Sequence, residues 1–95
     1  MHARVILGKV KLNKQDEAVN IYKESVVPAA KRQKGFLSMN LLTDPDTNKF
    51  ISITFWETES DMLASESSGY LQEQLGKIAI LFVGPPVIQS YIVSH

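Results

Sequence analysis

Residues 35–61 read GFLSMNLLTDPDTNKFISITFWETESD, and this stretch decides the fold. Both of its halves alternate along the chain and are rich in apolar and β-branched residues, which predicts two β-strands, 36–43 and 49–56. Residues 44–48 between them read DPDTN, and proline, aspartate and asparagine are typical of a turn. The stretch therefore predicts a β-hairpin that runs directly into the start of a helix.

The register of this hairpin is predicted from its cross-strand neighbours. One register sets polar side chains opposite polar ones and aromatic rings opposite aromatic rings, whereas a slip by one residue would mix them. The pairs in this register are Thr43–Lys49, Leu42–Phe50, Asn40–Ser52, Ser38–Thr54 and Phe36–Trp56.

The predicted hairpin has two different faces. One is uniformly apolar, and we expect it to pack against helices; it carries Leu37, Met39, Leu41, Ile51, Ile53 and Phe55. The other has small polar groups framed by aromatic rings; it carries Phe36, Ser38, Asn40, Leu42, Phe50, Ser52, Thr54 and Trp56. The second face suits a ligand cavity or a subunit interface, and the sequence leaves open which of the two it forms.

The rest of the chain supplies strands and helices on both sides of the hairpin. Residues 3–12 alternate as a strand, and Asn13 is a candidate cap for a helix from about residue 14 to 33. Within that helix Pro28 is expected to cause a kink, because it lacks a backbone N–H. Gly35 is a natural residue to follow the helix.

After the hairpin, Thr58 or Ser60 can cap a short helix, and Ser68 can cap another from Tyr70 onward. Residues 78–83 are interpreted as helix that ends in a loop, and 87–94 as the last strand. The positions with helical spacing in the last helix are Tyr70, Leu71, Gln74, Leu75 and Ile78.

The element order is thus β-α-β-β-α-β, which predicts a ferredoxin-like two-layer α+β sandwich in a single domain over residues 1–95. Its helices can cover only one face of the sheet. Because the other face also presents large apolar groups, we expect a second copy to cover it, which gives a homodimer through the sheet face.

Composition excludes several classes of protein. Ten basic and ten acidic residues cancel, so no basic surface indicates a nucleic-acid partner. The longest apolar run, 78–83, is far shorter than the ~20 residues of a membrane span. Cysteine is absent, which excludes disulfides and fits a cytoplasmic protein.

Several motifs resemble the antibiotic biosynthesis monooxygenase family. They are Pro28 followed by Gly35-Phe36, the strand end Trp56-Glu57-Thr58-Glu59-Ser60-Asp61, the segment Ser67-Ser68-Gly69-Tyr70-Leu71, and Pro85-Pro86 before the last strand. The resemblance covers nearly the whole chain. It implies a dimeric α+β barrel, which agrees with the fold predicted from the residues.

The family includes oxygenases that oxidise quinol-like molecules without metal or flavin, and enzymes that degrade haem. The haem-degrading relatives use a histidine in the helical segment after the tryptophan and an asparagine on the first strand. Residues 68–81 contain no histidine and residues 3–12 no asparagine, so haem degradation is not expected. The resemblance therefore implies chemistry without a cofactor.

The cofactor-free oxygenases place tryptophan, asparagine and tyrosine side chains around an aromatic substrate. Trp56 matches the tryptophan at the strand end, whereas Asn40 and Tyr91 match in residue type. We therefore expect Trp56, Asn40 and Tyr91 as catalytic residues and Ser52 and Tyr70 as substrate-binding residues. The alternative for each is a structural role in the core or at a subunit interface.

Other polar residues have plainer interpretations. Arg4 would neutralise an anionic substrate if it faced a cavity, and is otherwise a solvated strand residue. The acidic residues lack histidine or cysteine neighbours, so they are interpreted as helix-start charges and not as metal ligands. Two functions remain open: a monooxygenase-like protein acting on a small phenolic or quinol-type molecule, or a non-catalytic dimeric module that binds a small ligand or is associated with stress.

Overall fold

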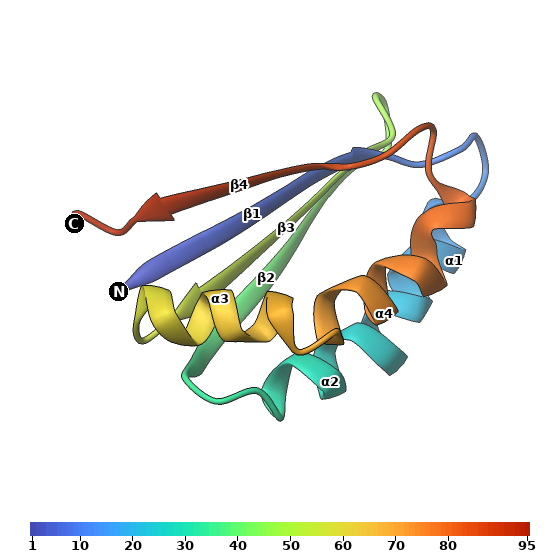
Figure 1. Ribbon diagram of the computed structural model, residues 1–95. Coiled ribbons are helices and arrows are strands. Elements are labelled where there is room, and N and C mark those ends of the chain that lie inside the picture. Colours follow the sequence, from blue (N-terminus) through green and yellow to red (C-terminus); the bar gives the residue numbers. More distant parts are fainter.

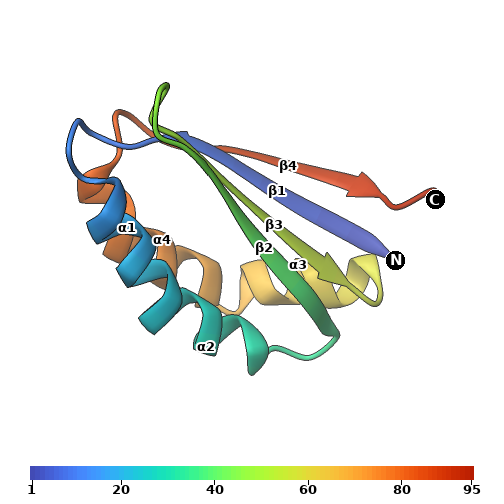
Figure 2. The same ribbon diagram turned by 180° about the vertical axis from the view of Figure 1, so that it is seen from behind.

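The computed structural model describes residues 1–95 and confirms the ferredoxin-like α+β fold. Its four strands form one antiparallel sheet in the order β2-β3-β1-β4, and the helices all lie on one face of that sheet (Figure 1; Figure 2 from behind). The elements are β1 (His2–Lys9), α1 (Gln15–Ile21), a π-helical turn (Tyr22–Val26), α2 (Val27–Lys31), β2 (Phe36–Asp44), β3 (Lys49–Trp56), α3 (Glu59–Ser67), α4 (Tyr70–Ile78), a 3-10 turn (Ala79–Leu81) and β4 (Val87–Ile92).

The first helical segment is interrupted, which corrects the prediction of one helix from 14 to 33. A wider π-helical turn over Tyr22–Val26 separates α1 from α2. Pro28 explains this, because its ring clashes with the carbonyl of the preceding turn and a wider turn relieves that clash. Asn13 does not cap the segment: it has a φ of +63°, and no side chain caps α1.

The elements after the hairpin follow the prediction closely. The Thr58 hydroxyl accepts a hydrogen bond from the Asp61 amide at 3.0 Å and caps α3, as expected. The N-cap of α4 is Gly69, at a φ of +89°, and not Ser68 as predicted; the Ser68 hydroxyl lies one residue earlier, 3.5 Å from the Tyr70 amide. The helix ends in a short 3-10 turn, and Phe82 is extended, in agreement with a helix that ends in a loop.

The predicted hairpin register is wrong by one residue over most of its length. Asp44 pairs with Lys49, so the loop is one residue shorter than expected, and Ser52 lies opposite Leu41 instead of Asn40. The Asp44 carboxylate accepts a hydrogen bond from the Asp46 amide at 3.0 Å, which holds this tighter turn. An irregularity between residues 36 and 38 then restores the predicted Phe36–Trp56 pair.

The two faces of β3 are the reverse of the prediction. Its helix-facing residues are Phe50, Ser52, Thr54 and Trp56, which are all buried, while Ile51, Ile53 and Phe55 lie on the other face and are partly exposed. The large rings decide the orientation, because burying Phe50 and Trp56 removes the most apolar surface from water. Met39 and Leu41 of β2 do pack toward the helices, as predicted.

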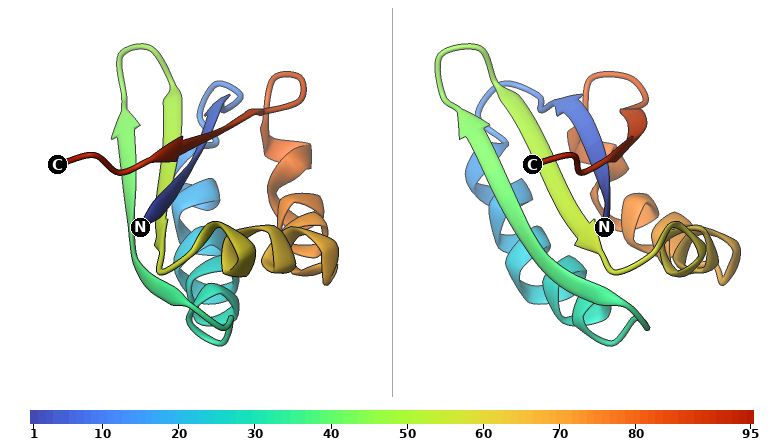
Figure 3. Two further views of the ribbon diagram at one scale, coloured as in Figure 1. Left: turned by 60° about the vertical axis from the view of Figure 1, so that its left-hand side comes forward. Right: turned by 90° about the vertical axis from the view of Figure 1, so that its left-hand side faces the viewer.

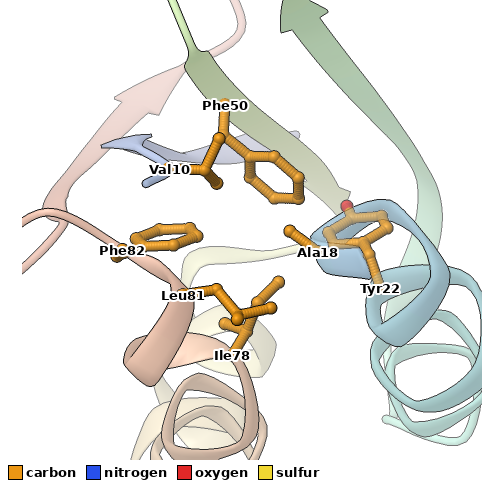
Figure 4. Packing of buried hydrophobic residues seen from close by; sticks show 7 residues of the cluster. All are labelled: Val10, Ala18, Tyr22, Phe50, Ile78, Leu81 and Phe82. Carbon is orange, nitrogen blue, oxygen red and sulfur yellow. The ribbon is translucent and has the colours of Figure 1, made fainter. Parts of the chain in front are cut away.

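The main core lies between the sheet and the helices (Figure 4). The rings of Phe50 and Phe82 meet edge to face with centroids 5.4 Å apart, and Tyr22 meets Phe50 in the same way at 5.9 Å. Val10 forms an isolated bridge with Phe82, beyond the end of β1. Seven buried residues form this cluster: Val10, Ala18, Tyr22, Phe50, Ile78, Leu81 and Phe82.

The opposite face of the sheet carries no helix and is called the open face below (Figure 3). The apolar residues that the strand registers place on it are Ala3, Val5, Leu7, Leu42, Ile51, Ile53, Phe55, Val87 and Tyr91. Three of them are about half exposed: Val87 at 56%, Tyr91 at 50% and Leu42 at 49%. None of the helices is both long and apolar enough to cross a membrane.

Candidate functional site

A small cavity lies between the helix-covered face of the sheet and the helices. Its volume is about 40 Å³, which is room for a few water molecules; an apolar cavity that admits benzene measures about 150 Å³. Most of its lining is apolar. The lining residues are Arg4, Ile6, Tyr22, Val26, Met39, Phe50, Ser52, Thr54, Tyr70, Leu71, Gln74, Leu75, Ile78 and Phe82.

Arg4 brings the only charged side chain into this lining, from the middle of β1. It is fully buried. Its Nη1 donates to the Ser65 hydroxyl at 3.0 Å and to the Met62 carbonyl at 3.3 Å, while a Glu66 carboxylate oxygen lies 3.6 Å away. The guanidinium carbon lies 5.1 Å from the ring centre of Trp56, within the range of a cation–π interaction.

The remaining donors of Arg4 are not used. Nε and Nη2 are buried and have no hydrogen-bond partner, and neither has the buried carboxylate oxygen of Glu66. Burial lowers the pKa of Arg4 from its ordinary value, and the charges of Glu66 and Tyr70 oppose this shift. An arginine remains protonated in proteins, so the cavity borders a permanent positive charge.

Two tyrosines supply hydroxyl groups to the cavity. The Tyr22 hydroxyl lies 2.6 Å from the Ser52 hydroxyl, and burial raises the pKa of Tyr22 to about 12 although this hydrogen bond opposes the shift. Burial also raises the pKa of Tyr70, against the opposing charge of Arg4. Both phenols are therefore protonated at neutral pH, so they can donate hydrogen bonds but cannot act as bases.

A short polar chain connects the cavity to the surface. The Ser25 hydroxyl donates to the side-chain carbonyl of Gln74 at 2.8 Å, and the Lys77 ammonium donates to Ser25 at 3.0 Å. This fixes the amide of Gln74 so that its NH₂ group is the part left free. Gln74 thus adds a neutral amide donor beside the cavity, in addition to the tyrosine and serine hydroxyls.

The structure brings three of the five predicted site residues together. Ser52 and Tyr70 both line the cavity. Trp56 lies directly behind the lining, fully buried, where its ring contacts Arg4 and its Nε1 donates to the Thr54 hydroxyl at 2.9 Å. Ser52 and Trp56 lie on the helix-covered face of the sheet, and Tyr70 faces it from α4.

The other two predicted residues lie elsewhere. Asn40 is exposed on the open face, opposite Ile53 of β3. Tyr91 is exposed on the same face, and its hydroxyl donates to the Gln89 side chain at 2.7 Å. Within one chain, the sheet separates Asn40 and Tyr91 from the cavity.

Sequence reasoning left open or missed three residues of the cavity. Arg4 alternates with Val5 and shares a face with Ile6, so strand periodicity places it inward once the inner face is known. Gln74 falls on the apolar stripe of its helix, and a polar residue at such a position is itself a signal. Tyr22 carries no signal that separates it from an ordinary core tyrosine.

The arrangement is suited to holding an oxyanion. A permanent cation, two neutral phenols and a serine hydroxyl surround a mostly apolar space, where low polarity strengthens each hydrogen bond. Neither a carboxylate nor a histidine belongs to the lining. No group of three histidine, cysteine, aspartate or glutamate side chains is placed to hold a metal ion.

Solved structures share this fold. A "putative antibiotic biosynthesis monooxygenase" from Bordetella bronchiseptica gives a TM-score of 0.85 at 16% identity, over 99% of this chain and 97% of its own. One from Nitrosomonas europaea gives 0.81 at 16% identity over 100% of both chains. A mutant of SnoaB, a cofactor-independent oxygenase from Streptomyces nogalater, gives 0.83 at 15% identity, over 99% and 93%.

At these identities the structural likeness establishes the fold alone. No curated protein matches the chain. The sequence itself, however, matches the profile of the family described as antibiotic biosynthesis monooxygenase over residues 1–74, which is most of its length. The chain therefore belongs to the antibiotic biosynthesis monooxygenase family.

Proposed function

We propose that this protein is a cofactor-independent monooxygenase that oxidises a small phenolic or quinol-type substrate in the cavity between sheet and helices. The observation that carries the proposal is the gathering of Arg4, Tyr22, Ser52 and Tyr70 around one apolar space. Family membership supports the reaction class, and the aromatic surroundings support a flat substrate.

A deprotonated phenol or quinol is electron-rich enough to reduce dioxygen without a cofactor. In the overall reaction one substrate carbon that carries hydrogen becomes a carbonyl. One oxygen atom of O₂ enters that carbonyl, and the other leaves as water with the two hydrogens that the substrate loses. The substrate loses four electrons and O₂ gains four, so the reaction balances with O₂ as its only oxidant.

The protein's part is to favour the substrate anion. Arg4 contributes positive charge, while Tyr70 and the hydrogen-bonded Tyr22–Ser52 pair each contribute one neutral donor toward the oxygen on which charge develops. Because the lining contains no carboxylate or histidine, the proton passes to water in this proposal. Trp56 supports the site from behind through its cation–π contact with the Arg4 guanidinium.

The volume of the cavity favours a second candidate function. At about 40 Å³ it is smaller than an aromatic ring needs, and Met39 and Phe82 help to close it. An oxygenase must therefore open this space, for which the flexible Met39 side chain is well suited. If the space stays closed to rings, the protein is a non-catalytic module that binds a smaller ligand.

We also propose that the protein is a homodimer through the open face of the sheet. This face presents Val5, Leu7, Ile53 and Phe55 without any covering helix, and an apolar surface of this kind is typical of an interface. The dimer would leave the cavity intact, because the cavity lies on the other side of the sheet. A cytoplasmic location is proposed on the absence of cysteine.

Oxygen consumption with a panel of quinols and anthrone-like compounds tests the oxygenase proposal. The cavity variants Ser52→Ala and Tyr70→Phe should lower turnover at least about tenfold, since Tyr70→Phe removes a donor and Ser52→Ala removes the partner that orients the Tyr22 hydroxyl. Asn40→Ala and Tyr91→Phe on the open face serve as comparison variants and also test the prediction that these two residues are catalytic.

Three outcomes separate the possibilities. Turnover that falls only in the cavity variants supports the proposed site. Loss confined to the open-face variants contradicts it and returns the site to Asn40 and Tyr91. No oxygen consumption with any compound, together with binding of a small ligand in the cavity, supports the non-catalytic candidate.

A further inference from the structure

We propose that the ligand of this cavity carries a carboxylate, and that the carboxylate binds the Nε–Nη2 edge of Arg4. This inference rests on the proposed function, because it names the chemical class of ligand for the same cavity. It deepens that function, since neither family membership nor an apolar cavity requires a ligand with a permanent negative charge.

The two edges of the Arg4 guanidinium are used differently. Nη1 alone makes both protein hydrogen bonds, to Ser65 and Met62. The two donors on the other edge, Nε and Nη2, have no partner although they are buried. An unpaired buried donor is unfavourable, more so on a charged group, so this edge is better explained by a ligand than by stability.

The geometry of the free guanidinium edge matches a carboxylate. Nε–H and one Nη2–H are parallel, and this planar fork matches the two oxygens of a carboxylate. A neutral phenol offers one oxygen and satisfies the fork poorly. Arg4 belongs to the lining of the cavity, but its Nε and Nη2 are covered in this conformation, so a carboxylate reaches them only when neighbouring apolar side chains move aside.

Contacts with Trp56, Ser65 and Met62 also restrain the Arg4 side chain. The Trp56 ring lies 5.1 Å from the guanidinium carbon, and hydrogen bonds to Ser65 and Met62 hold Nη1, so the free edge is restrained. Little conformational freedom is left for a ligand to remove. Such preorganisation is typical of a binding residue.

Glu66 allows a further test, because its carboxylate and a ligand carboxylate would both interact with the positive charge of Arg4. Its carboxylate lies 3.6 Å from Nη1, too far for a good hydrogen bond, and its side chain is 32% exposed. The pair is nearly neutral overall, so an incoming carboxylate is repelled by Glu66 and attracted by Arg4. Removing the Glu66 charge should therefore tighten binding, an effect that a merely structural Arg4 does not produce.

The experiment measures binding of benzoate and of benzamide, its neutral counterpart of nearly equal shape. Trp56 is the only tryptophan and lies against Arg4, so its fluorescence reports occupation of the site. Calorimetric titration gives the affinity independently. Propionate covers the case in which a ring is too large for the cavity. We expect benzoate or propionate to bind and benzamide not to bind.

Two variants should change the affinity for carboxylates in opposite directions. Arg4→Lys keeps the charge but removes the fork, so carboxylate binding should weaken at least about tenfold. Glu66→Gln should strengthen it several-fold. Arg32→Lys, the same change at the exposed arginine beyond α2, should leave it unchanged. Glu66 lies on α3 outside the cavity lining and its side chain is partly exposed, so Glu66→Gln keeps the test valid even if Arg4→Lys fails to fold.

Three results would overturn the inference: equal binding of benzoate and benzamide, carboxylate binding that neither variant changes, or no binding of either carboxylate at millimolar concentration. Failure here and failure of the proposed function are distinguishable. Wild-type protein that consumes oxygen with neutral quinols but binds no carboxylate keeps the oxygenase and loses this inference, whereas carboxylate binding without oxygen consumption does the reverse.

Discussion

The two faces of the sheet are built from the same strands but have opposite character. The helix-covered face buries polar side chains, among them Arg4, Ser52 and Thr54. The open face exposes aliphatic and aromatic side chains such as Ile53 and Phe55, which no helix covers. In a free-standing domain neither these polar groups within a mostly apolar inner face nor an uncovered apolar outer face is expected.

This contrast indicates what each face does. Polar groups are buried only where hydrogen bonds or a ligand compensate for their lost hydration, so the polar inner face marks the candidate binding site. Apolar side chains stay uncovered only where a partner shields them, so the open face marks the proposed subunit interface. The predictions below test this contrast, one face against the other.

Removing Trp56 should have the largest effect. Trp56→Ala deletes a fully buried ring that meets Phe36 edge to face and supports Arg4, so the free energy of unfolding should fall by about 3–5 kcal/mol. Phe55→Ala, its neighbour on the open face, should lower it by only about 1 kcal/mol at high dilution. Urea unfolding followed by circular dichroism measures both, and equal losses would mean that the faces are not distinct.

A charge on the open face should separate the subunits without harming the cavity. Ile53→Lys would bury an unpaired ammonium in the interface, which weakens association by about 3–5 kcal/mol. Sedimentation should then show a folded monomer that still binds the cavity ligand. Ile80→Lys, at a position 74% exposed on the 3-10 turn, should remain dimeric. A wild-type protein that is already monomeric would contradict the interface.

Alkaline pH should lower the stability of the fold through the tyrosines buried between the sheet and the helices. The pKa of Tyr22 is raised to about 12 in the folded chain from 10.0, so the folded state keeps its proton where the unfolded state loses it. Stability is therefore full below pH 10 and falls between pH 10 and 12, by about 1.4 kcal/mol per unit. Tyr70, whose pKa is also raised, adds to the same loss.

Tyr22→Phe tests this dependence. The variant should be about 1 kcal/mol less stable at neutral pH, because Ser52 loses its partner, yet should lose less stability on alkaline titration. Tyr91→Phe, on the open face, is the control and should follow the wild type. Identical alkaline profiles for all three proteins would show that Tyr22 is not buried as described.

A further comparison concerns neighbouring residues of β1. A Cβ at Gly8 would overlap the Phe82 ring, so Gly8→Ala should force that ring to move and lower the free energy of unfolding by about 1–3 kcal/mol. Lys9→Ala, facing the other way, should change it by no more than about 0.5 kcal/mol. Thermal unfolding of both variants checks this, and a harmless Gly8→Ala would place the residue outside the core.

The fold was predictable because its signals are local. Strand alternation, the DPDTN turn and the Thr58 cap each depend on a few consecutive residues, and each appears in the structure. The inner face of the hairpin was not predictable in the same way. A loop shorter by one residue shifts the register, and the alternation in β3 does not say which set of side chains the helices will cover.

The site was predictable only in part, because its geometry joins distant segments. Ser52 and Tyr70 do line the cavity, and Trp56 lies against it. The burial of Arg4, however, depends on partners 58 and 61 residues away along the chain. No local pattern contains that information, and so Arg4 could be interpreted equally well as solvated.

The most direct test of the account is to map where a ligand binds by amide chemical shifts. A dihydroxynaphthalene under anaerobic conditions, or benzoate, should shift the amides of Ser52, Thr54 and Tyr70. It should leave those of Gln89 and Tyr91 on the open face unchanged. Shifts confined to the open face would contradict the account, because the ligand would then occupy the surface that we assign to the partner subunit.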